Sequence, residues 1–242
     1  MRICLSIVSH GQADLVDALL QSVDEFVVSE EHEVLVVITE NTSAEYKCTC
    51  KYPVDYTFNL RQKGFGANHN AAFERTTPDY FLVINPDITF KSEFCLDHLV
   101  SAMTVSNVDL TSPIITDKFG ETVDYKRADL TLINLIKRRV FKQTERCFDW
   151  YAGMFLVFTG KSYLALEGFD PRFFLYVEDC DICVRATRQG YQIEDVLNVS
   201  VQHDARRTSS NLFSIYYFWH LSSLLKYWLK RVSFKAFGSY DK

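Results

Sequence analysis

The sequence has 242 residues, of which 48% are hydrophobic and 14% aromatic, and its formal net charge is −5. Such a chain is long enough to bury a core and too apolar for a disordered protein, and no apolar run approaches the roughly 20 residues that span a bilayer. Residues 206–242 carry seven Lys and Arg against Asp241, a net +6, which leaves −11 for residues 1–205. An acidic body argues against nucleic-acid binding, and a basic tail favours contact with an anionic surface.

Predicted strands and helices alternate through the amino-terminal half. Apolar and periodic runs predict these elements, in the order strand Ile3–Val8, helix Asp14–Val23, strands Val34–Thr39 and Tyr56–Asn59, helix Ala67–Arg75 and strand Tyr80–Ile84. This alternation is typical of crossover units. It predicts an α/β fold with a Rossmann-like, mostly parallel central sheet flanked by helices.

Polar, loop-forming residues directly follow three of these strands. They are Ser9-His10-Gly11, Glu40-Asn41-Thr42-Ser43 and Asn85-Pro86-Asp87. Because ligands of open α/β sheets bind beyond the carboxyl ends of the strands, these loops are the first candidates for a binding site.

The carboxyl-terminal half is less regular. The stretch Asp117–Phe148 is more basic and predicts an excursion outside the sheet. Beyond it the patterns predict the strand Met154–Phe158, the short helix Lys161–Leu166 and the turn Gly168–Pro171. A longer helix, Cys180–Gln189, is predicted to stop at Gly190, and a final strand follows at Val199–Gln202.

The basic tail predicts an amphipathic helix from about Tyr217 to Val232. Such a helix either packs on the body of the protein or lies in a membrane interface. In the second case its Leu and Trp residues would face the acyl chains, and Lys226, Lys230 and Arg231 would face anionic head groups.

The seven cysteines are scattered, apart from two close pairs. Cys180 and Cys183 have the spacing of a redox or zinc pair, but no second pair completes a zinc site. Buried, reduced thiols are the better interpretation.

Several short motifs have both a structural and a functional interpretation. Gly64-Phe65-Gly66 is consistent with a plain turn, and Asn85-Pro86-Asp87 with a helix cap. The carboxylates Glu178, Asp179 and Asp181 are consistent with a solvated helix start, and His203 with a loop histidine.

The order and separation of these motifs resemble those of the family-2 glycosyltransferases with the A-type nucleotide-sugar-binding fold, over nearly the whole chain. The matching segments are Val8-Ser9-His10, Gly64-Phe65-Gly66 with Asn70, Asn85-Pro86-Asp87, Asp149-Trp150-Tyr151-Ala152-Gly153, Gly168-Phe169-Asp170, Glu178-Asp179-Cys180-Asp181 and His203. Within the family the chain is most similar to bacterial rhamnosyltransferases of O-antigen assembly. In this chain, Phe218-Trp219-His220-Leu221 followed by Lys226 resembles the carboxyl-terminal tail of those enzymes.

The resemblance implies an inverting enzyme whose general base is Asp179, with Glu178 as the alternative candidate. An inverting transfer needs such a base on the acceptor side. Like charges raise the pKa of Asp179, whereas the helix amino terminus opposes them. Asp181 is expected to face away, toward Arg185 one turn later, and the aromatic run Phe173–Tyr176 to exclude water from the site.

The resemblance also implies a nucleotide-sugar donor and a divalent metal, Mg²⁺ or Mn²⁺. Asp87 and His203 are the expected metal ligands, and Asn85 stands where the family more often has a second aspartate. The expected donor contacts are Ser9, Glu40, Asn41, Gly66, Asn70, Asn85, Asp87 and, at the diphosphate, Lys226. Glu40 and Gln62 also depart from the common Asp and Asn of the family.

The expected acceptor contacts are Trp150, Tyr151 and Gly153. Trp150 offers an aromatic face to a sugar ring, and core packing is its equally weighted alternative.

Residues 1–205 are expected to form the catalytic domain, with a donor half (1–112) and an acceptor half (113–205). Residues 206–242 are expected to form the basic helical tail.

The resemblance favours transfer of L-rhamnose from dTDP-L-rhamnose to an undecaprenyl-diphosphate-linked saccharide of bacterial O-antigen or lipopolysaccharide. The expected location is the cytoplasmic, inner face of the cytoplasmic membrane, as a peripheral protein without nucleic-acid partners. A UDP-hexose donor is the main alternative. A non-catalytic sugar-binding subunit is a third, disfavoured because a binding module needs no base.

Overall fold

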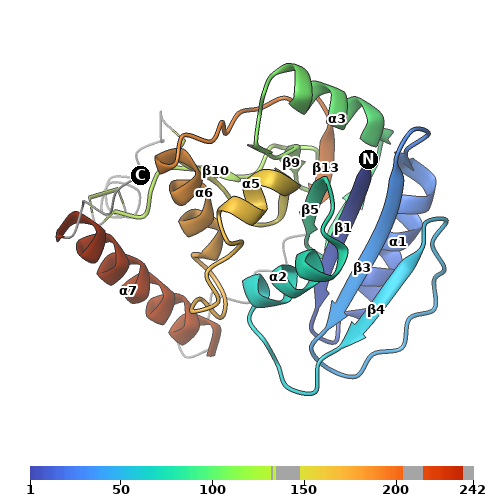
Figure 1. The fold of residues 1–242 in the computed structure, drawn as a ribbon. Coiled ribbons are helices and arrows are strands. Elements are labelled where there is room, and N and C mark those ends of the chain that lie inside the picture. The colour runs from blue at the N-terminus through green and yellow to red at the C-terminus, as the bar shows by residue number, and fades with distance from the viewer. Residues whose placement is uncertain (132, 135–147, 204–214, 237–242) are drawn as a thin grey trace.

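The computed structural model describes residues 1–131, 133–134, 148–203 and 215–236 (Figure 1). Its central sheet has six strands in the order β4-β3-β1-β5-β12-β8. Their bounds are Val54–Phe58, Glu33–Glu40, Arg2–Ser9, Tyr80–Ile84, Phe155–Thr159 and Leu110–Thr111. The first four strands are parallel, and β12 is antiparallel to both of its neighbours. The predicted mostly parallel α/β sheet is therefore confirmed.

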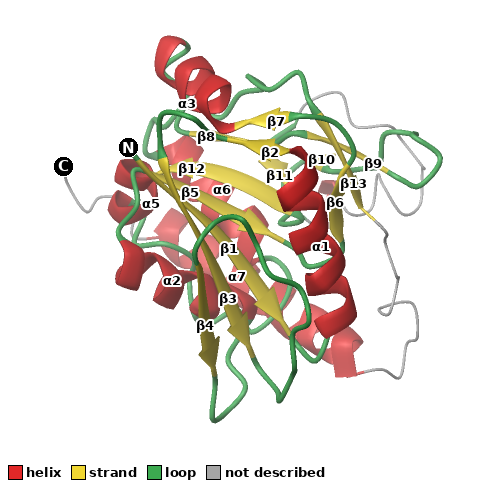
Figure 2. Ribbon diagram, turned by 90° about the vertical axis from the view of Figure 1, so that its right-hand side faces the viewer, coloured by secondary structure: helices red, strands yellow, loops and turns green. Residues whose placement is uncertain are grey.

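Helices cover both faces of this sheet, which explains why its central strands are apolar at almost every position. Helix α1 (Ala13–Phe26) and helix α2 (Phe65–Thr76) lie on opposite sides of β1 and β3 (Figure 2). Every residue of β5 is buried, and so is β1 after its first residue. Helix α3 (Leu96–Val105) and helix α5 (Gly160–Ala165) complete the cover.

A second, three-stranded sheet has the order β6-β13-β9, with bounds Ile88–Phe90, Ser200–His203 and Ile114–Thr116. Strand β13 is antiparallel to β6, and its register places His203 opposite Ile88. This pairing brings His203 next to the carboxyl end of β5, more than 100 residues earlier in the chain. Two further strand pairs are β2 (Val27–Val28) with β7 (Phe94–Cys95), and β10 (Lys126–Arg127) with β11 (Trp150–Tyr151).

Two helices of the carboxyl-terminal half lie beside each other. Helix α6 (Glu178–Arg188) ends before Gly190, whose φ of +84° is the left-handed conformation expected of a helix stop. The long helix α7 (Ile215–Ala236) runs next to α6, away from the central sheet (Figure 1). Among the described residues, no helix is both long enough and apolar enough to cross a membrane.

The predicted elements are present with small shifts at their ends, but several short ones were not predicted. These are α3 and the strands β2, β6, β7, β8, β9, β10 and β11. Most are two or three residues long, so no periodicity marks them. Much of the predicted excursion 117–148 lies outside the described residues. The six cysteines of the described part are free. Cys4, Cys180 and Cys183 are buried as predicted, whereas Cys48, Cys50 and Cys95 are partly exposed.

Candidate active site

A cavity of about 1050 Å³ lies between the carboxyl ends of β1 and β5 and the helices α6 and α7. Polar residues of the strand-end loops form one side: His10, Gln12, Asp14, Asn41, Lys63, Asn85 and Asp87. The other side is largely apolar and includes Leu130, Trp150, Leu175, Trp219, Leu221, Leu224 and Trp228. Glu178 and Asp179 also line it. The cavity therefore has a polar half and an apolar half, with two adjacent carboxylates at its wall.

The Asp179 carboxylate is held by two backbone donors. Its Oδ2 accepts a hydrogen bond from Gly153 N at 2.8 Å, and its Oδ1 accepts one from Cys180 N at 2.9 Å. Burial raises the pKa of Asp179, although these two hydrogen bonds and the nearby charge of Arg127 oppose the rise. Asp179 is thus a fixed carboxylate on the cavity wall, with a proton affinity above that of an ordinary aspartate.

Glu178 is only 4% exposed, and its Oε2 has no hydrogen-bond partner among the described residues. Burial and the adjacent Asp179 charge raise the pKa of Glu178 from 4.5 to about 8. The two backbone donors at Asp179 and the unpartnered Oε2 of Glu178 favour the negative charge on Asp179 and the proton on Glu178.

The backbone just before this pair is strained. Tyr176 and Val177 have φ values of +69° and +73°, the left-handed region that a β-branched valine rarely adopts. Each such residue costs on the order of 1–3 kcal/mol and persists only where the surroundings hold it. The chain therefore enters α6 through a constrained turn that sets the position of both carboxylates.

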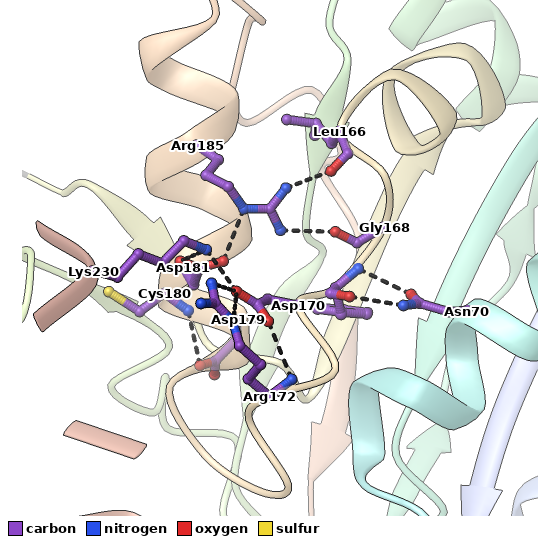
Figure 3. A network of polar contacts seen from close by, with 11 residues as sticks. Asn70, Leu166, Gly168, Asp170, Arg172, Asp179, Cys180, Asp181, Arg185 and Lys230 are labelled. Atoms are coloured by element: carbon purple, nitrogen blue, oxygen red, sulfur yellow. Dashed lines mark hydrogen bonds and ion pairs between the residues drawn. The ribbon is translucent and has the colours of Figure 1, made fainter. Parts of the chain in front are cut away.

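Asp181 faces away from the cavity, as predicted. Its Oδ2 accepts from Arg185 Nε at 2.8 Å, which confirms the predicted contact one helical turn apart. Its Oδ1 accepts from Lys230 Nζ of α7 at 2.7 Å (Figure 3). Asp181 thus belongs to an ion network between α6 and α7.

Asp87 and His203 meet at the polar side of the cavity, where His203 Nε2 lies 3.2 Å from Asp87 Oδ1. The Nδ1 atom of His203 is buried and has no partner within the described part of the chain. A carboxylate and an imidazole are both suitable ligands for a divalent cation. The described residues bring no group of three or more His, Cys, Asp or Glu together, so a cation here fits only if the substrate and water supply its other ligands.

Glu40 and Ser9 lie beneath the cavity and do not line it. Glu40 is fully buried, and its Oε1 accepts from Gly11 N at 2.8 Å and from both the N and Oγ1 of Thr42 at 2.9 and 3.0 Å. Its Oε2 accepts from Tyr46 OH at 2.7 Å. Burial alone would raise the pKa of Glu40, but these hydrogen bonds, with one from Ser9, lower it. In this structure Glu40 ties together the loops that follow β1 and β3.

Asn41 does line the cavity, and its side chain is fully engaged. Its Oδ1 accepts from Asn59 Nδ2 at 2.9 Å and from Lys63 N at 3.0 Å, while its Nδ2 donates to Lys63 O at 3.0 Å. Asn41 therefore fixes the 59–63 loop at the polar edge of the cavity.

Gly66 and Asn70 support the acceptor side and do not line the cavity. The Asn70 side chain donates to Phe169 O at 2.7 Å and accepts from Phe169 N at 2.9 Å (Figure 3). A Cβ on Gly66 would lie 2.5 Å from the Cβ of Phe169, so only glycine permits this packing. Both residues anchor the turn at Gly168 and Phe169, and their predicted contact with the nucleotide stays a prediction.

Trp150 and Gly153 line the cavity, whereas Tyr151 does not. The Trp150 ring is 5% exposed and its Nε1 donates to Ala128 O at 2.9 Å. The Tyr151 hydroxyl donates to Asp195 Oδ1 at 2.6 Å. A Cβ on Gly153 would lie 3.3 Å from the Cβ of Asp179, so the glycine permits the close backbone approach to that carboxylate.

Helix α7 was predicted as a separate tail but forms one wall of the cavity. Sequence reasoning missed its lining residues, Tyr216, Trp219, His220, Leu221, Leu224 and Trp228, as well as Lys63 and the residues Gln12, Ala13, Asp14 and Leu15 that follow the predicted loop after β1. Helical spacing could identify the faces of α7, but not which face turns inward.

For the basic residues of α7, the structure bears out the packing alternative and not a position at anionic head groups. Lys226 Nζ donates to Arg172 O at 2.8 Å, outside the cavity lining, Lys230 binds Asp170 and Asp181, and Arg231 binds Asp129. The indole nitrogen of Trp228 likewise donates inward, to Leu130 O at 2.8 Å. An apolar stripe faces outward instead and is at least half exposed: Ile215, Phe218, Leu221, Leu225 and Leu229. The acidic partners on the body explain the reversal, because they pair with the basic residues.

Comparison with known proteins agrees with this arrangement. The family model described as glycosyl transferase family 2 matches residues 6–164, more than half of the chain. Rhamnosyltransferase WbbL from Escherichia coli (strain K12) is 27% identical, over 91% of this chain and 90% of that protein.

Two solved structures share the fold at 14% identity. The mannosyltransferase PcManGT from Pyrobaculum calidifontis, in complex with GDP-Man and Mn²⁺, superimposes with a TM-score of 0.63 over 94% of this chain. GalNAc-T7 with UDP, GalNAc and Mn²⁺ superimposes with a TM-score of 0.67 over 93%. This chain spans 64% and 47% of the lengths of those two structures. The family model covers more than half of the chain, and the mostly parallel sheet is that of the A-type glycosyltransferase fold, so the chain belongs to glycosyltransferase family 2.

Proposed function

We propose that the protein transfers L-rhamnose, with inversion, from dTDP-L-rhamnose to an undecaprenyl-diphosphate-linked saccharide in the assembly of O-antigen or a related bacterial surface polysaccharide. The observation that carries the transfer chemistry is the Asp179 carboxylate, held by Gly153 N on the wall of a large two-sided cavity. The similarity to a rhamnosyltransferase supports the choice of sugar.

Asp179 would act as the general base. It takes the proton of the acceptor hydroxyl as that oxygen attacks the anomeric carbon from the face opposite the leaving diphosphate. The two backbone hydrogen bonds hold the carboxylate in one orientation, and burial strengthens it as a base. The protonated Glu178 beside it adds no second negative charge. The pair thereby keeps a single ionised carboxylate at the site.

Asp87 and His203 would hold a divalent cation, Mg²⁺ or Mn²⁺, whose positive charge stabilises the departing nucleoside diphosphate. Their 3.2 Å separation and the polar side of the cavity support this role. Asn85 and Asn41, which line the same side, would contact the donor. Ser9, Glu40, Gly66 and Asn70 would support the donor site from behind, through the loops that they anchor.

The apolar half of the cavity supports an acceptor with an apolar portion. Leu221 lines the cavity and is also 50% exposed, so it joins the cavity to the outward stripe of α7. A lipid-linked saccharide fits this polarity, with its sugar near Trp150 and Asp179 and its lipid along α7. The same stripe would place the protein, as a peripheral protein, on the inner face of the cytoplasmic membrane.

Isothermal titration calorimetry with dTDP and UDP, with and without Mn²⁺, tests the donor and the metal. We expect tighter binding of dTDP than of UDP and a gain in affinity from Mn²⁺. Asp87→Ala should lose this Mn²⁺-dependent gain, and His203→Ala should lose less of it. Glu93→Ala, which removes an exposed carboxylate outside the cavity lining, is the control. Preference for UDP would support the alternative, a UDP-hexose transferase. Equal affinity with and without Mn²⁺ would exclude the metal role.

Binding to liposomes with anionic lipids tests the membrane surface. Leu225→Glu places a charge in the exposed stripe, and we expect it to release the protein, because a buried leucine side chain contributes about 1.5–3 kcal/mol. Val105→Glu, at an 83% exposed apolar position of α3, is the control. Equal sedimentation of wild type and Leu225→Glu with liposomes would contradict the proposed membrane contact.

A third possible function is that of a sugar-binding subunit without activity. Such a protein would bind nucleotide sugars but would not transfer the sugar.

A further inference from the structure

The segment 170–177 leads from the turn at Phe169 to the carboxylates of α6. We propose that the inward face of α7 holds this segment in its strained conformation and thereby positions Asp179, with Ser223 as a positioning residue. This inference rests on the proposed role of Asp179 as the base.

Contacts from α7 follow the segment almost residue by residue. Ser223 Oγ donates to Leu175 O at 3.0 Å, and Lys226 Nζ donates to Arg172 O at 2.8 Å. The Trp219 ring centre lies 4.7 Å from that of Phe174, and the His220 ring centre lies 5.3 Å from that of Tyr176. Positions 219, 220, 223, 226 and 230 recur with the spacing of one helix face. A whole face of α7 is therefore committed to this segment.

The ends of the segment are tied to α7 by charge. Lys230 Nζ lies 2.9 Å from Asp170 Oδ2 and 2.7 Å from Asp181 Oδ1, so one side chain bridges the start of the segment and the first turn of α6 (Figure 3). Arg185 extends the network from Asp181 to the carbonyls of Leu166 and Gly168. Asp181 and Lys230 are 3% and 15% exposed, so solvent screens this pair little.

The opposite side of the segment is held by the start of α2. Phe65 N donates to Phe174 O at 2.9 Å, next to the carbonyl that Ser223 holds. A Cβ on Gly64 would lie 2.6 Å from Phe174 O, so the two backbones are in close contact. Successive carbonyls, Phe174 and Leu175, are thus fixed from α2 and from α7.

This double anchorage explains why the left-handed pair Tyr176 and Val177 persists. Without the donor at Leu175 O, rotation of the next peptide units toward ordinary φ values would relieve their strain. Because Glu178 and Asp179 follow directly, such a relaxation would move Asp179 away from Gly153 N. The donor side of the cavity comes from other elements, so binding of the nucleotide would be unaffected.

Ser223→Ala tests the inference, with the exposed neighbour Ser222→Ala as its matched control. In hydrogen–deuterium exchange, we expect the amides of residues 174–181 to exchange about 3- to 10-fold faster in Ser223→Ala, the range for loss of one hydrogen bond.

Kinetics give the second readout. With dTDP-L-rhamnose and a short-chain prenyl-diphosphate-linked sugar as substrates, we expect kcat to fall by a similar factor while KM for the donor stays constant. The stoichiometry of dTDP binding measures the folded fraction. Lys226→Met, which keeps the apolar stem, should change exchange and kcat in the same direction.

Wild-type exchange rates in both Ser223→Ala and Lys226→Met would overturn the inference. Faster exchange at an unchanged kcat would also overturn it, because α7 would then only pack against the segment. The proposed function fails separately: full activity of Asp179→Asn would exclude Asp179 as the base, whatever the exchange data show for the segment.

Discussion

Two glutamates of this protein are almost equally buried but have opposite electrostatic environments. Glu40 is fully buried below the donor side of the cavity, and Glu178 is 4% exposed at its acceptor side. Glu40 accepts hydrogen bonds from Gly11, Thr42 and Tyr46, whereas Glu178 Oε2 has no partner among the described residues. Burial raises the pKa of both, but the hydrogen bonds reverse this for Glu40, while the charge of Asp179 adds to it for Glu178.

The comparison shows that partners, more than burial, decide what a buried carboxylate does. Glu40 is a stably ionised acceptor that joins two loops, which is a structural role beneath a binding site. Glu178 is a protonated neighbour that leaves the negative charge on Asp179, which suits catalysis. The loops around Glu40 are therefore held by satisfied hydrogen bonds, whereas the segment at Glu178 stores strain and an unsatisfied polar atom, as functional sites often do.

The largest effect is expected from the pair at the acceptor side. Asp179→Asn keeps the size of the side chain and removes its basicity, so transfer should fall by roughly 10²–10⁴-fold, the range for loss of a general base. Nucleotide binding, measured by calorimetry, should persist. Glu178→Gln is the matched control and should retain most activity at pH 7, because Glu178 is already uncharged there. The opposite ranking of the two variants would assign the base to Glu178.

A smaller effect is expected at Glu40. Glu40→Gln keeps its shape but removes the charge that donors from Gly11, Thr42 and Tyr46 share, so unfolding should become easier by about 1.5–3 kcal/mol. For a domain of this size, each kcal/mol lowers Tm by about 2–4 °C. The folded-state pKa of Glu40 is lowered, so the advantage of wild type is fully present above the unfolded pKa near 4.5 and is lost as the pH falls from there through the lower folded-state pKa. A Tm difference that persisted undiminished at pH 3 would contradict this origin.

An effect of opposite sign is expected for Glu178→Gln. The folded-state pKa of Glu178 is raised, so its protonated form is fully stable below pH 4.5, and wild type loses stability as the pH rises from there to about 8. The Gln variant does not titrate. The Tm of the Gln variant relative to that of wild type should therefore rise steadily between pH 4.5 and pH 8. A Tm advantage that did not grow between these two pH values would show that Glu178 is ionised in the folded protein.

Much of the donor side could be predicted from the chain alone. The strands β1, β3 and β5 and the helices between them follow from local apolar periodicity, because each pattern reports the burial of consecutive residues. The position of Asp87 and Asn41 on the cavity wall follows from parallel strands whose carboxyl ends share one edge. The Asp181–Arg185 contact follows from helical spacing.

Local sequence patterns could not predict the contacts between residues that are far apart in the chain. The meeting of His203 with Asp87 depends on the register of β13 against β6, which no local signal specifies. Ser9 and Glu40 stand at predicted strand ends, but whether such residues face the ligand or the loops behind it depends on donors from other segments.

The sequence by itself determined the alternation of strands and helices, the polar strand-end loops, the carboxylate pair at the start of a helix and the amphipathic character of α7. These features depend on residues that are neighbours along the chain. Only the tertiary structure decided which face of α7 turns inward, because Lys230 and Arg231 find their partners at Asp170, Asp181 and Asp129. It likewise decided that Glu40 is ionised and Glu178 protonated, since the free energy of a buried charge depends on the donors and charges that distant segments bring to it.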